Sequence, residues 1–182
     1  MELTQEQKGK IGETAVMLEL LKKGFNVINI NNSYPNYKNV DLICMNANNG
    51  KSVMIQVKTG TTHNILTGFT SELDGSIPNL ETSVIGPWVF VYMPDDKLSN
   101  IEFYILTKEE VIKLISSSNK WYVTEWNRKL TSKPRVGVEV DWLKGESSKA
   151  SKENAKKQHP EYKSTLHQSS KDNWWKITEL LD

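Results

Sequence analysis

The sequence has little cysteine, no long apolar run and almost no net charge. One cysteine, Cys44, among 182 residues excludes a disulfide framework, a zinc site of paired cysteines and a thioredoxin-type redox pair. The longest run of aliphatic and aromatic residues, 88–93, is far shorter than the roughly 20 residues of a membrane-spanning helix. The N-terminal sequence MELTQEQKGK lacks the apolar segment of a secretory signal. These absences predict a cytoplasmic protein that does not enter a membrane.

The formal net charge is +1, from 23 basic and 22 acidic residues. A large positive excess is common among nucleic-acid binders, so such a function would have to come from the local placement of charges. The length suits one globular domain with a tail. Between 145 and 171 the composition shifts to Lys, Ser, Glu and Gln, whereas 173–182 is apolar again. We therefore predict a domain over 1–143 and, over 144–182, a polar arm or lid followed by a docking segment.

Capping signals and periodicity predict the secondary structure. Thr4 and Gln7 form a capping-box pattern and Gly24 suits the position after a helix, so a helix is predicted over 4–23. Its apolar arc includes Ile11, Ala15, Met17, Leu18 and Leu21. Residues 59–86 show no clear period and are predicted to be irregular, with one short element at most. The other predicted elements are strands at 25–30, 40–45, 52–58, 88–93 and 101–106, a helix at 108–118 and an edge strand at 136–140.

A predicted β-hairpin brings three polar residues onto one face of a sheet. Asn49-Gly50 favours a two-residue turn that places Asp41 opposite Lys58, and a loop two residues longer places it opposite Gln56. In either register Asp41, Gln56 and Lys58 project from the same face, because side chains alternate along a strand. The opposite face is predicted to be core and carries Val40, Leu42, Cys44, Val53, Ile55 and Val57.

Glu13 lies on the predicted helix among the apolar residues Val16, Met17 and Leu20. A carboxylate in such surroundings is expected to be partly buried, and an unpaired buried charge is strongly unfavourable. Glu13 therefore needs a partner, for which the sequence offers Lys58 or a metal ion.

A series of short motifs runs through residues 9–59. They are Gly9, Gly12 and Glu13 in the helix, then Leu20, Gly24-Phe25 and Val27, then VDLI at 40–43 and IQVKT at 55–59. Together they resemble the PD-(D/E)xK nuclease superfamily, especially its resolvase-like and Mrr-like restriction branches. The resemblance implies an α/β fold of restriction-endonuclease-like type, with a mixed central sheet flanked by helices and a C-terminal extension. The strand at 88–93 fits the next strand of that fold.

The resemblance also implies a metal-dependent endonuclease that hydrolyses phosphodiester bonds in DNA. Asp41 would be the principal ligand of Mg²⁺ or Mn²⁺, and Glu13 a direct or water-mediated ligand. Gln56 and the Val57 carbonyl would be secondary ligands. Lys58 would orient the attacking water or help to deprotonate it, and would offset charge in the transition state. A divalent metal supplies much of what such a hydrolysis needs.

The sequence departs from the family pattern in two places. Gln56 stands where most members carry Glu or Asp, although Mrr-like members are similar in carrying Gln. Its carbonyl oxygen can still bind Mg²⁺, but the site loses one negative charge. The helix that this fold usually places between its third and fourth strands is not recognisable in residues 59–86.

Further residues are candidates for nucleic-acid contact, each with a structural alternative. Thr59 can hydrogen-bond a phosphate or simply end its strand. His63 can contact a phosphate or a metal-bound water, or be a turn residue without a role. A mixture of basic and aromatic residues suits base stacking, a dimer surface or docking of the tail equally well. Its members include Trp121, Trp126, Arg128, Lys129, Arg135, Trp174 and Trp175.

Other interpretations remain open at the level of the sequence. Asp41 and Lys58 can form an ordinary cross-strand ion pair, which contributes little when exposed. The chain can be a nuclease-fold module that binds nucleic acid or protein without turnover, which is consistent with Gln56 and the near-neutral charge. It can also be a protein–protein partner such as an inhibitor, which predicts no cluster of Glu13 with Asp41 and Lys58. The sequence is compatible with a homodimer.

Overall fold

A five-stranded and a three-stranded β-sheet, with helices packed against them, form the framework of the protein. The computed structural model describes residues 3–32, 39–94, 100–120, 123, 132–140 and 165–182. Over these residues, no helix combines the length and the apolar composition needed to cross a membrane.

The predicted mixed sheet flanked by helices is confirmed. β1, β2 and β3 pair antiparallel, β3 and β5 pair parallel, and β5 and β6 pair antiparallel, in the spatial order β1-β2-β3-β5-β6. The strands lie where the sequence predicts them: β1 (Asn26–Asn29), β2 (Leu42–Met45), β3 (Ser52–Gly60), β5 (Trp88–Tyr92) and β6 (Glu102–Leu106).

Helix α1 (Gln5–Lys22) begins and ends as the sequence predicts. The Thr4 hydroxyl accepts a hydrogen bond from the Gln7 backbone N–H, and the Gln7 side-chain oxygen accepts one from the Thr4 N–H. Both donors belong to the helix start, where no intrahelical acceptor exists for them. Gly24 has a φ of 89°, in the left-handed region that favours glycine after a helix.

The predicted apolar arc of α1 is wrong in its orientation. The buried residues of the helix are Lys8, Gly12, Val16 and Leu20, each four positions after the last. Leu18 and Leu21 of the predicted arc are instead 55% and 46% exposed. Gly12 explains the difference, because its backbone lies so close to β3 that an added Cβ would overlap the Thr59 side chain. A hydrophobic pattern gives glycine little weight and therefore misses a contact made by backbone.

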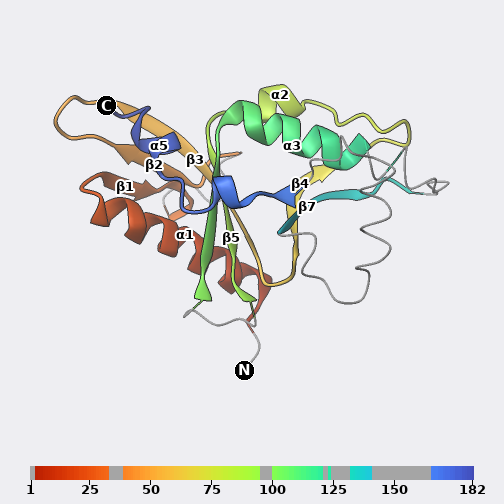
Figure 1. Ribbon diagram of the computed structural model, residues 1–182, viewed down its shortest axis with the longest axis horizontal. Helices are drawn as coiled ribbons and strands as arrows, with labels where there is room; N and C mark the ends of the chain where they lie inside the picture. The colour runs from red at the N-terminus through yellow and green to blue at the C-terminus, as the bar shows by residue number, and fades with distance from the viewer. Residues whose placement is uncertain (1–2, 33–38, 95–99, 121–122, 124–131, 141–164) are drawn as a thin grey trace.

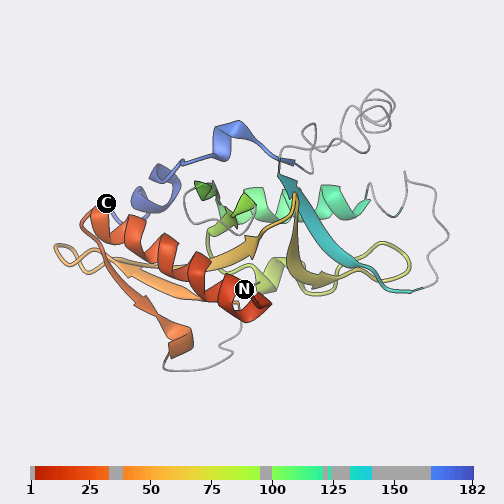
Figure 2. The same ribbon diagram turned by 90° about the horizontal axis from the view of Figure 1, so that it is seen from below.

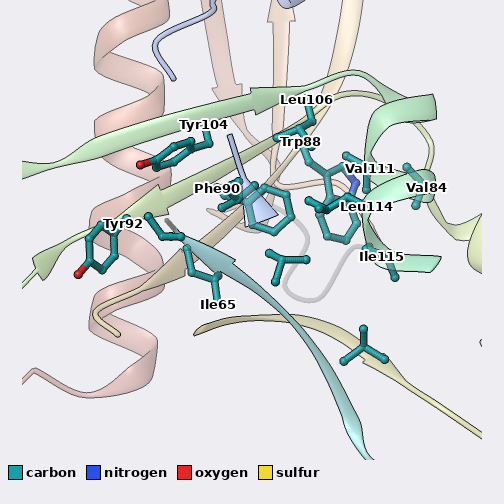
Figure 3. Close-up of a cluster of buried hydrophobic side chains, with 14 of the residues drawn as sticks. Ile65, Val84, Trp88, Phe90, Tyr92, Tyr104, Leu106, Val111, Leu114 and Ile115 are labelled. Carbon is teal, nitrogen blue, oxygen red and sulfur yellow. The ribbon is translucent and has the colours of Figure 1, made fainter. Parts of the chain in front are cut away.

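Side-chain alternation gives the central sheet two packed faces. One face joins Val16 and Leu20 of α1 and Ile177 of the C-terminal helix α5 (Trp175–Thr178) in a single core. The other packs Trp88 and Phe90 of β5 against α2 (Leu80–Ser83), α3 (Lys108–Lys120) and the second sheet (Figure 3). In Figure 1, α1 lies beside β1–β3, whereas α2 and α3 lie at the other end of the molecule. The predicted core face of the hairpin is confirmed: Val40, Leu42, Cys44, Val53, Ile55 and Val57 are buried.

The second sheet has the order β4-β7-β8, with β4 (Asn64–Thr70), β7 (Arg135–Val140) and β8 (Thr165–Leu166). β4 corrects the prediction that 59–86 is irregular. Its buried side chains alternate with exposed ones, but Thr67 is a polar member of the buried set, so the pattern is weak. The sequence predicts β7 as an edge strand, but β7 lies in the middle of this second sheet, because β8 pairs with it from a distant part of the chain.

The end of the chain packs against the central sheet (Figure 2). Trp174, Ile177 and Leu181 are buried in the core that α1 covers. The side-chain amides of Asn46 and Asn49 both donate to the Leu181 carbonyl, at 3.0 and 2.8 Å. Residues 141–164, most of the predicted polar arm, lie outside the described residues. The division into a domain and an arm therefore stays a prediction.

Replacing Gly12 with alanine is expected to destabilise the protein by about 1–3 kcal/mol, because the new methyl group overpacks against Thr59. Gly9→Ala is the matched control on the same helix. Apart from its chain neighbours and the adjacent helix backbone, no described atom lies within 4 Å of a Cβ at position 9, and alanine is favoured over glycine in a helix by about 1 kcal/mol. Urea unfolding curves measure both effects. A Gly12→Ala variant as stable as Gly9→Ala would contradict this packing.

Candidate functional site

Asp41 lies at the centre of the polar cluster. The ladder pairs Leu42 with Ile55, which puts Asp41 opposite Gln56, the longer-loop register of the two predicted. The buried Asp41 carboxylate accepts a hydrogen bond from the Asn31 amide at 3.0 Å on Oδ1. On Oδ2 it accepts one from the Gln56 amide and one from the Val57 backbone N–H, the latter at 2.7 Å. Three donors thus hold the carboxylate in one orientation.

Glu13 reaches the same cluster from α1. Its Oε2 accepts a hydrogen bond from Asn29 Nδ2 at 2.7 Å, and its Oε1 accepts one from Asn31 Nδ2 at 3.3 Å. Because Asn31 Nδ2 also donates to Asp41 Oδ1, the two carboxylate oxygens lie within about 6 Å of each other. The partners of Glu13 are therefore two asparagine amides, where the sequence offered Lys58 or a metal ion.

The electrostatics of Glu13 follow from this placement. Burial raises the pKa of its carboxyl above the usual value, and the hydrogen bond from Asn29 opposes that change. The nearby negative charge of Asp41 raises the pKa further, whereas the hydrogen bond from Asn31 and the charge of Lys10 lower it. The ionised form of Glu13 is thus held at a cost, as expected for an acid drawn out of water beside a second acid.

Lys58 extends from β3 over the aromatic core. Its Nζ lies 5.4 Å from the centre of the Trp88 ring, a cation–π distance, and close to Gly68 of β4. Within the described part of the chain no ion pair joins Lys58 to Asp41, so the ordinary cross-strand pair is not formed. Burial lowers the pKa of Lys58, and the charges of Asp41 and Glu13 oppose this change.

These residues share one cavity of about 890 Å³ between the N-terminal half of α1, the 3-10 helix η1 (Ile30–Asn32) and β3. On its exposed side Lys10 forms an ion pair with Glu6 at 2.7 Å. Apart from Gly9, its lining is polar: Glu6, Lys10, Glu13, Asn31, Asn32, Asn39, Asp41, Gln56 and Lys58. The cavity thus collects three carboxylates, several amides and two amines, of which Glu6 and Lys10 are paired with each other.

The donor set of this cavity fits a hard divalent cation. It offers the carboxylates of Glu13 and Asp41 and the amide oxygen of Gln56, to which no described residue donates a hydrogen bond. Mg²⁺ prefers oxygen ligands and keeps several waters, so it needs few protein ligands. Over the described residues, no three His, Cys, Asp or Glu side chains cluster around a potential metal position. A cation here would therefore depend on amide or main-chain oxygens in addition to the two acids.

Thr59 and His63 are not brought into this cavity. Thr59 faces α1, and its hydroxyl is buried against Gly12 with no hydrogen-bond partner among the described residues, a placement that does not favour the predicted phosphate contact. His63 Nδ1 lies 3.2 Å from the Val140 carbonyl oxygen, and its ring packs 5.3 Å from that of Tyr92. His63 therefore helps to hold β7 against the central sheet.

The basic and aromatic candidates lie away from the cavity or beyond the described residues. Arg135 is exposed at the start of β7, opposite Thr70 of β4, and does not line the cavity. Trp174 is buried, whereas Trp175 is 57% exposed. The remaining members, Trp121, Trp126, Arg128 and Lys129, lie outside the described residues, so the predicted nucleic-acid contact of Arg128 and Lys129 stays a prediction.

Sequence reasoning missed Asn29 and Asn31, which both donate to Glu13, Asn31 also donating to Asp41. Asn29 uses both ends of its amide, since its Oδ1 also accepts from the Asn31 backbone N–H at 2.9 Å. The signal was the pair of asparagines spaced two apart, one at the end of the first strand and one just after it. Asparagine is so common in turns that its presence there carried no functional weight.

No protein-family model matches the sequence, and no curated protein matches it. Among solved structures, that of a bacterial homing endonuclease is similar to this chain, with a TM-score of 0.44 and 16% sequence identity. The match covers 87% of this chain and 97% of that chain. Membership of the PD-(D/E)xK superfamily stays a prediction.

The stability of the protein is expected to depend on pH through Glu13. Because the folded-state pKa is raised, ionised Glu13 destabilises the fold above that pKa, and the cost disappears below the unfolded pKa of about 4.5. The difference in unfolding free energy between Glu13→Gln and wild type should therefore shift in favour of the variant as the pH rises from about 4 to 7. Denaturant titrations across this range measure it. Glu19→Gln is the control, since Glu19 lies on the same helix and is paired with Lys22, and an equal shift in both variants would contradict the assignment to Glu13.

Proposed function

We propose that the protein is a metal-dependent endonuclease that hydrolyses phosphodiester bonds in DNA, with Glu13, Asp41, Gln56 and Lys58 as its site. One observation carries the proposal: an acid from α1 and an acid from the hairpin converge on one amide in a cavity that an amine also lines. An inhibitor-like interaction protein has no need for such a cluster.

The chain's own residues have distinct tasks in this proposal. Asp41, oriented by three donors, would be the principal metal ligand, with Glu13 beside it as a direct or water-mediated ligand. Gln56 would turn its amide and offer the oxygen, and the Val57 carbonyl would complete the protein ligands. The metal would supply a more acidic bound water and neutralise charge on the phosphate.

Lys58 would act on the attacking water and on the charge that develops at the phosphate. Trp88 supports the ammonium group, and burial lowers its pKa, so that the neutral amine is more accessible than in water. A neutral amine can take a proton from the attacking water, and the ammonium form can stabilise the developing negative charge. Both tasks require the amine to stay free of a carboxylate partner, as it is among the described residues.

Asp41→Asn should abolish binding of Mn²⁺ and lower the Mg²⁺-dependent cleavage of plasmid DNA by about 100-fold or more, because the principal negative ligand is lost. Calorimetric titration with Mn²⁺ and gel assays of plasmid relaxation measure the two effects. Asp74→Asn, in an exposed turn, is the matched control and should leave both unchanged.

Thermal unfolding of Asp41→Asn verifies that the variant is folded. If wild type and Asp41→Asn give identical, metal-independent titration traces and neither cleaves DNA, the proposed enzymatic function is overturned. That result would favour a module that binds nucleic acid or protein without turnover, which the neutral Gln56 also allows.

Lys58→Met should lower the cleavage rate by about 100-fold and leave the affinity for Mn²⁺ within about threefold of wild type, because the amine acts on the water and not on the metal. Methionine keeps an apolar chain over Trp88, so the packing is largely retained. Lys51→Met, in the exposed hairpin loop, is the control. Full activity in Lys58→Met would remove Lys58 from the mechanism.

A further inference from the structure

Asn31 occupies the point on which the two carboxylates converge. A single amide nitrogen, Nδ2, donates to Glu13 Oε1 at 3.3 Å and to Asp41 Oδ1 at 3.0 Å. Two negatively charged groups that approach within several ångströms need a positive or donor group between them. In this structure the Asn31 amide is the donor between them.

Asn31 is related to Asp41 in the same way as Gln56 is. The amide of Asn31 donates to Oδ1 and the amide of Gln56 donates to Oδ2, so the carboxylate lies between two side-chain amides. In each amide the oxygen receives no hydrogen bond from any described residue. Both residues also line the cavity. The chemical argument that makes Gln56 a candidate oxygen ligand therefore applies equally to Asn31.

Backbone hydrogen bonds hold Asn31 and the residue before it. The Asn31 N–H donates to Asn29 Oδ1 at 2.9 Å, and the neighbouring Ile30 N–H donates to the Asp41 carbonyl at 2.9 Å. Ile30 is itself buried. The amide of Asn31 can therefore rotate about its last side-chain bond, a torsion with a broad and roughly two-fold preference, while its position against Asp41 is kept.

We propose that Asn31 is a further ligand residue of the site: its NH₂ holds Glu13 and Asp41 together in the metal-free protein, and its oxygen turns inward to bind the divalent cation. The ligand oxygens from side chains are then two charged and two neutral, a set that suits a hard cation which keeps several waters. This inference rests on the proposed function, because it assumes that the cavity takes a divalent cation.

Opposite substitutions at position 31 test the assignment. Asn31→Asp keeps the shape and adds a charged oxygen, so it should tighten the binding of Mn²⁺ about tenfold. Asn31→Leu removes both polar atoms and should weaken binding about tenfold. A merely structural asparagine would lower the affinity in both variants. Calorimetric titration with Mn²⁺ alone, in the absence of DNA, measures these affinities.

Asn32 provides the matched control, since it follows Asn31 in the chain, lines the same cavity and makes no hydrogen bond to either acid. Asn32→Asp adds the same charge and should change the affinity by about threefold or less. Mn²⁺ should also raise the melting temperature of Asn31→Asp more than that of wild type, because tighter binding to the folded state stabilises it more. This second readout remains valid even where Asn31→Leu is poorly folded.

Failure of this inference differs from failure of the proposed function. Equal Mn²⁺ affinity in wild type, Asn31→Asp and Asn31→Leu overturns the role of Asn31, whereas cleavage by wild type then still supports the nuclease. An equal gain in Mn²⁺ affinity in Asn31→Asp and Asn32→Asp also overturns the role of Asn31, since the added charge alone would explain the gain. A third outcome is that the Mn²⁺ affinity rises in Asn31→Asp and falls in Asn31→Leu while wild type does not cleave DNA. This outcome supports Asn31 as a ligand residue and overturns the proposed nuclease function.

Discussion

Gly12 is where α1 meets β3 without a side chain between them, and the geometry of the site follows from that contact. An added Cβ would overlap Thr59, so the helix lies against the strand at backbone distance. The close approach fixes the rotation of α1 about its axis, because only the face with Gly12 can turn inward. The next residue along the helix is Glu13, which this rotation directs to the end of β1 and to η1. The packing of Gly12 thus decides where the Glu13 carboxylate lies.

Two acids of the cavity, Glu13 and Asp41, are held by amides. Glu13 and Asp41 together accept hydrogen bonds from Asn29, Asn31 and Gln56, and Asp41 also accepts one from a backbone N–H. These neutral donors do not remove the cost of ionising Glu13, since burial first, and then the charge of Asp41, keep the pKa of its carboxyl raised. An arrangement that keeps two carboxylates charged and close is unfavourable for folding and favourable for binding a cation. Carboxyl groups with pKa values shifted in this way are typical of functional sites.

The second sheet supports the site from the other side. Phe69 of β4 stacks on Trp88, with ring centres 6.1 Å apart and planes 7° apart, and Trp88 packs on Phe90. This aromatic group lies under the Lys58 amine, which is 5.4 Å from the Trp88 ring. A Cβ at Gly68 of β4 would lie 3.6 Å from the Lys58 Nζ, so β4 runs beside the end of that side chain. The strand that sequence reasoning missed therefore helps to position the amine.

Sequence alone determined the limits of α1 and the strand positions, and it placed Asp41, Gln56 and Lys58 on one face. These features depend on capping and on the period-two alternation of strands, which act between residues close in the chain. Only the tertiary structure decided the hairpin register, the rotation of α1 and the position of Asn31 between Glu13 and Asp41. Each of these depends on the fit between segments distant in sequence, such as Gly12 against Thr59, and steric fit of this kind leaves no periodic signal in the sequence. The pairing of β7 with β8 could not be predicted from the sequence for the same reason.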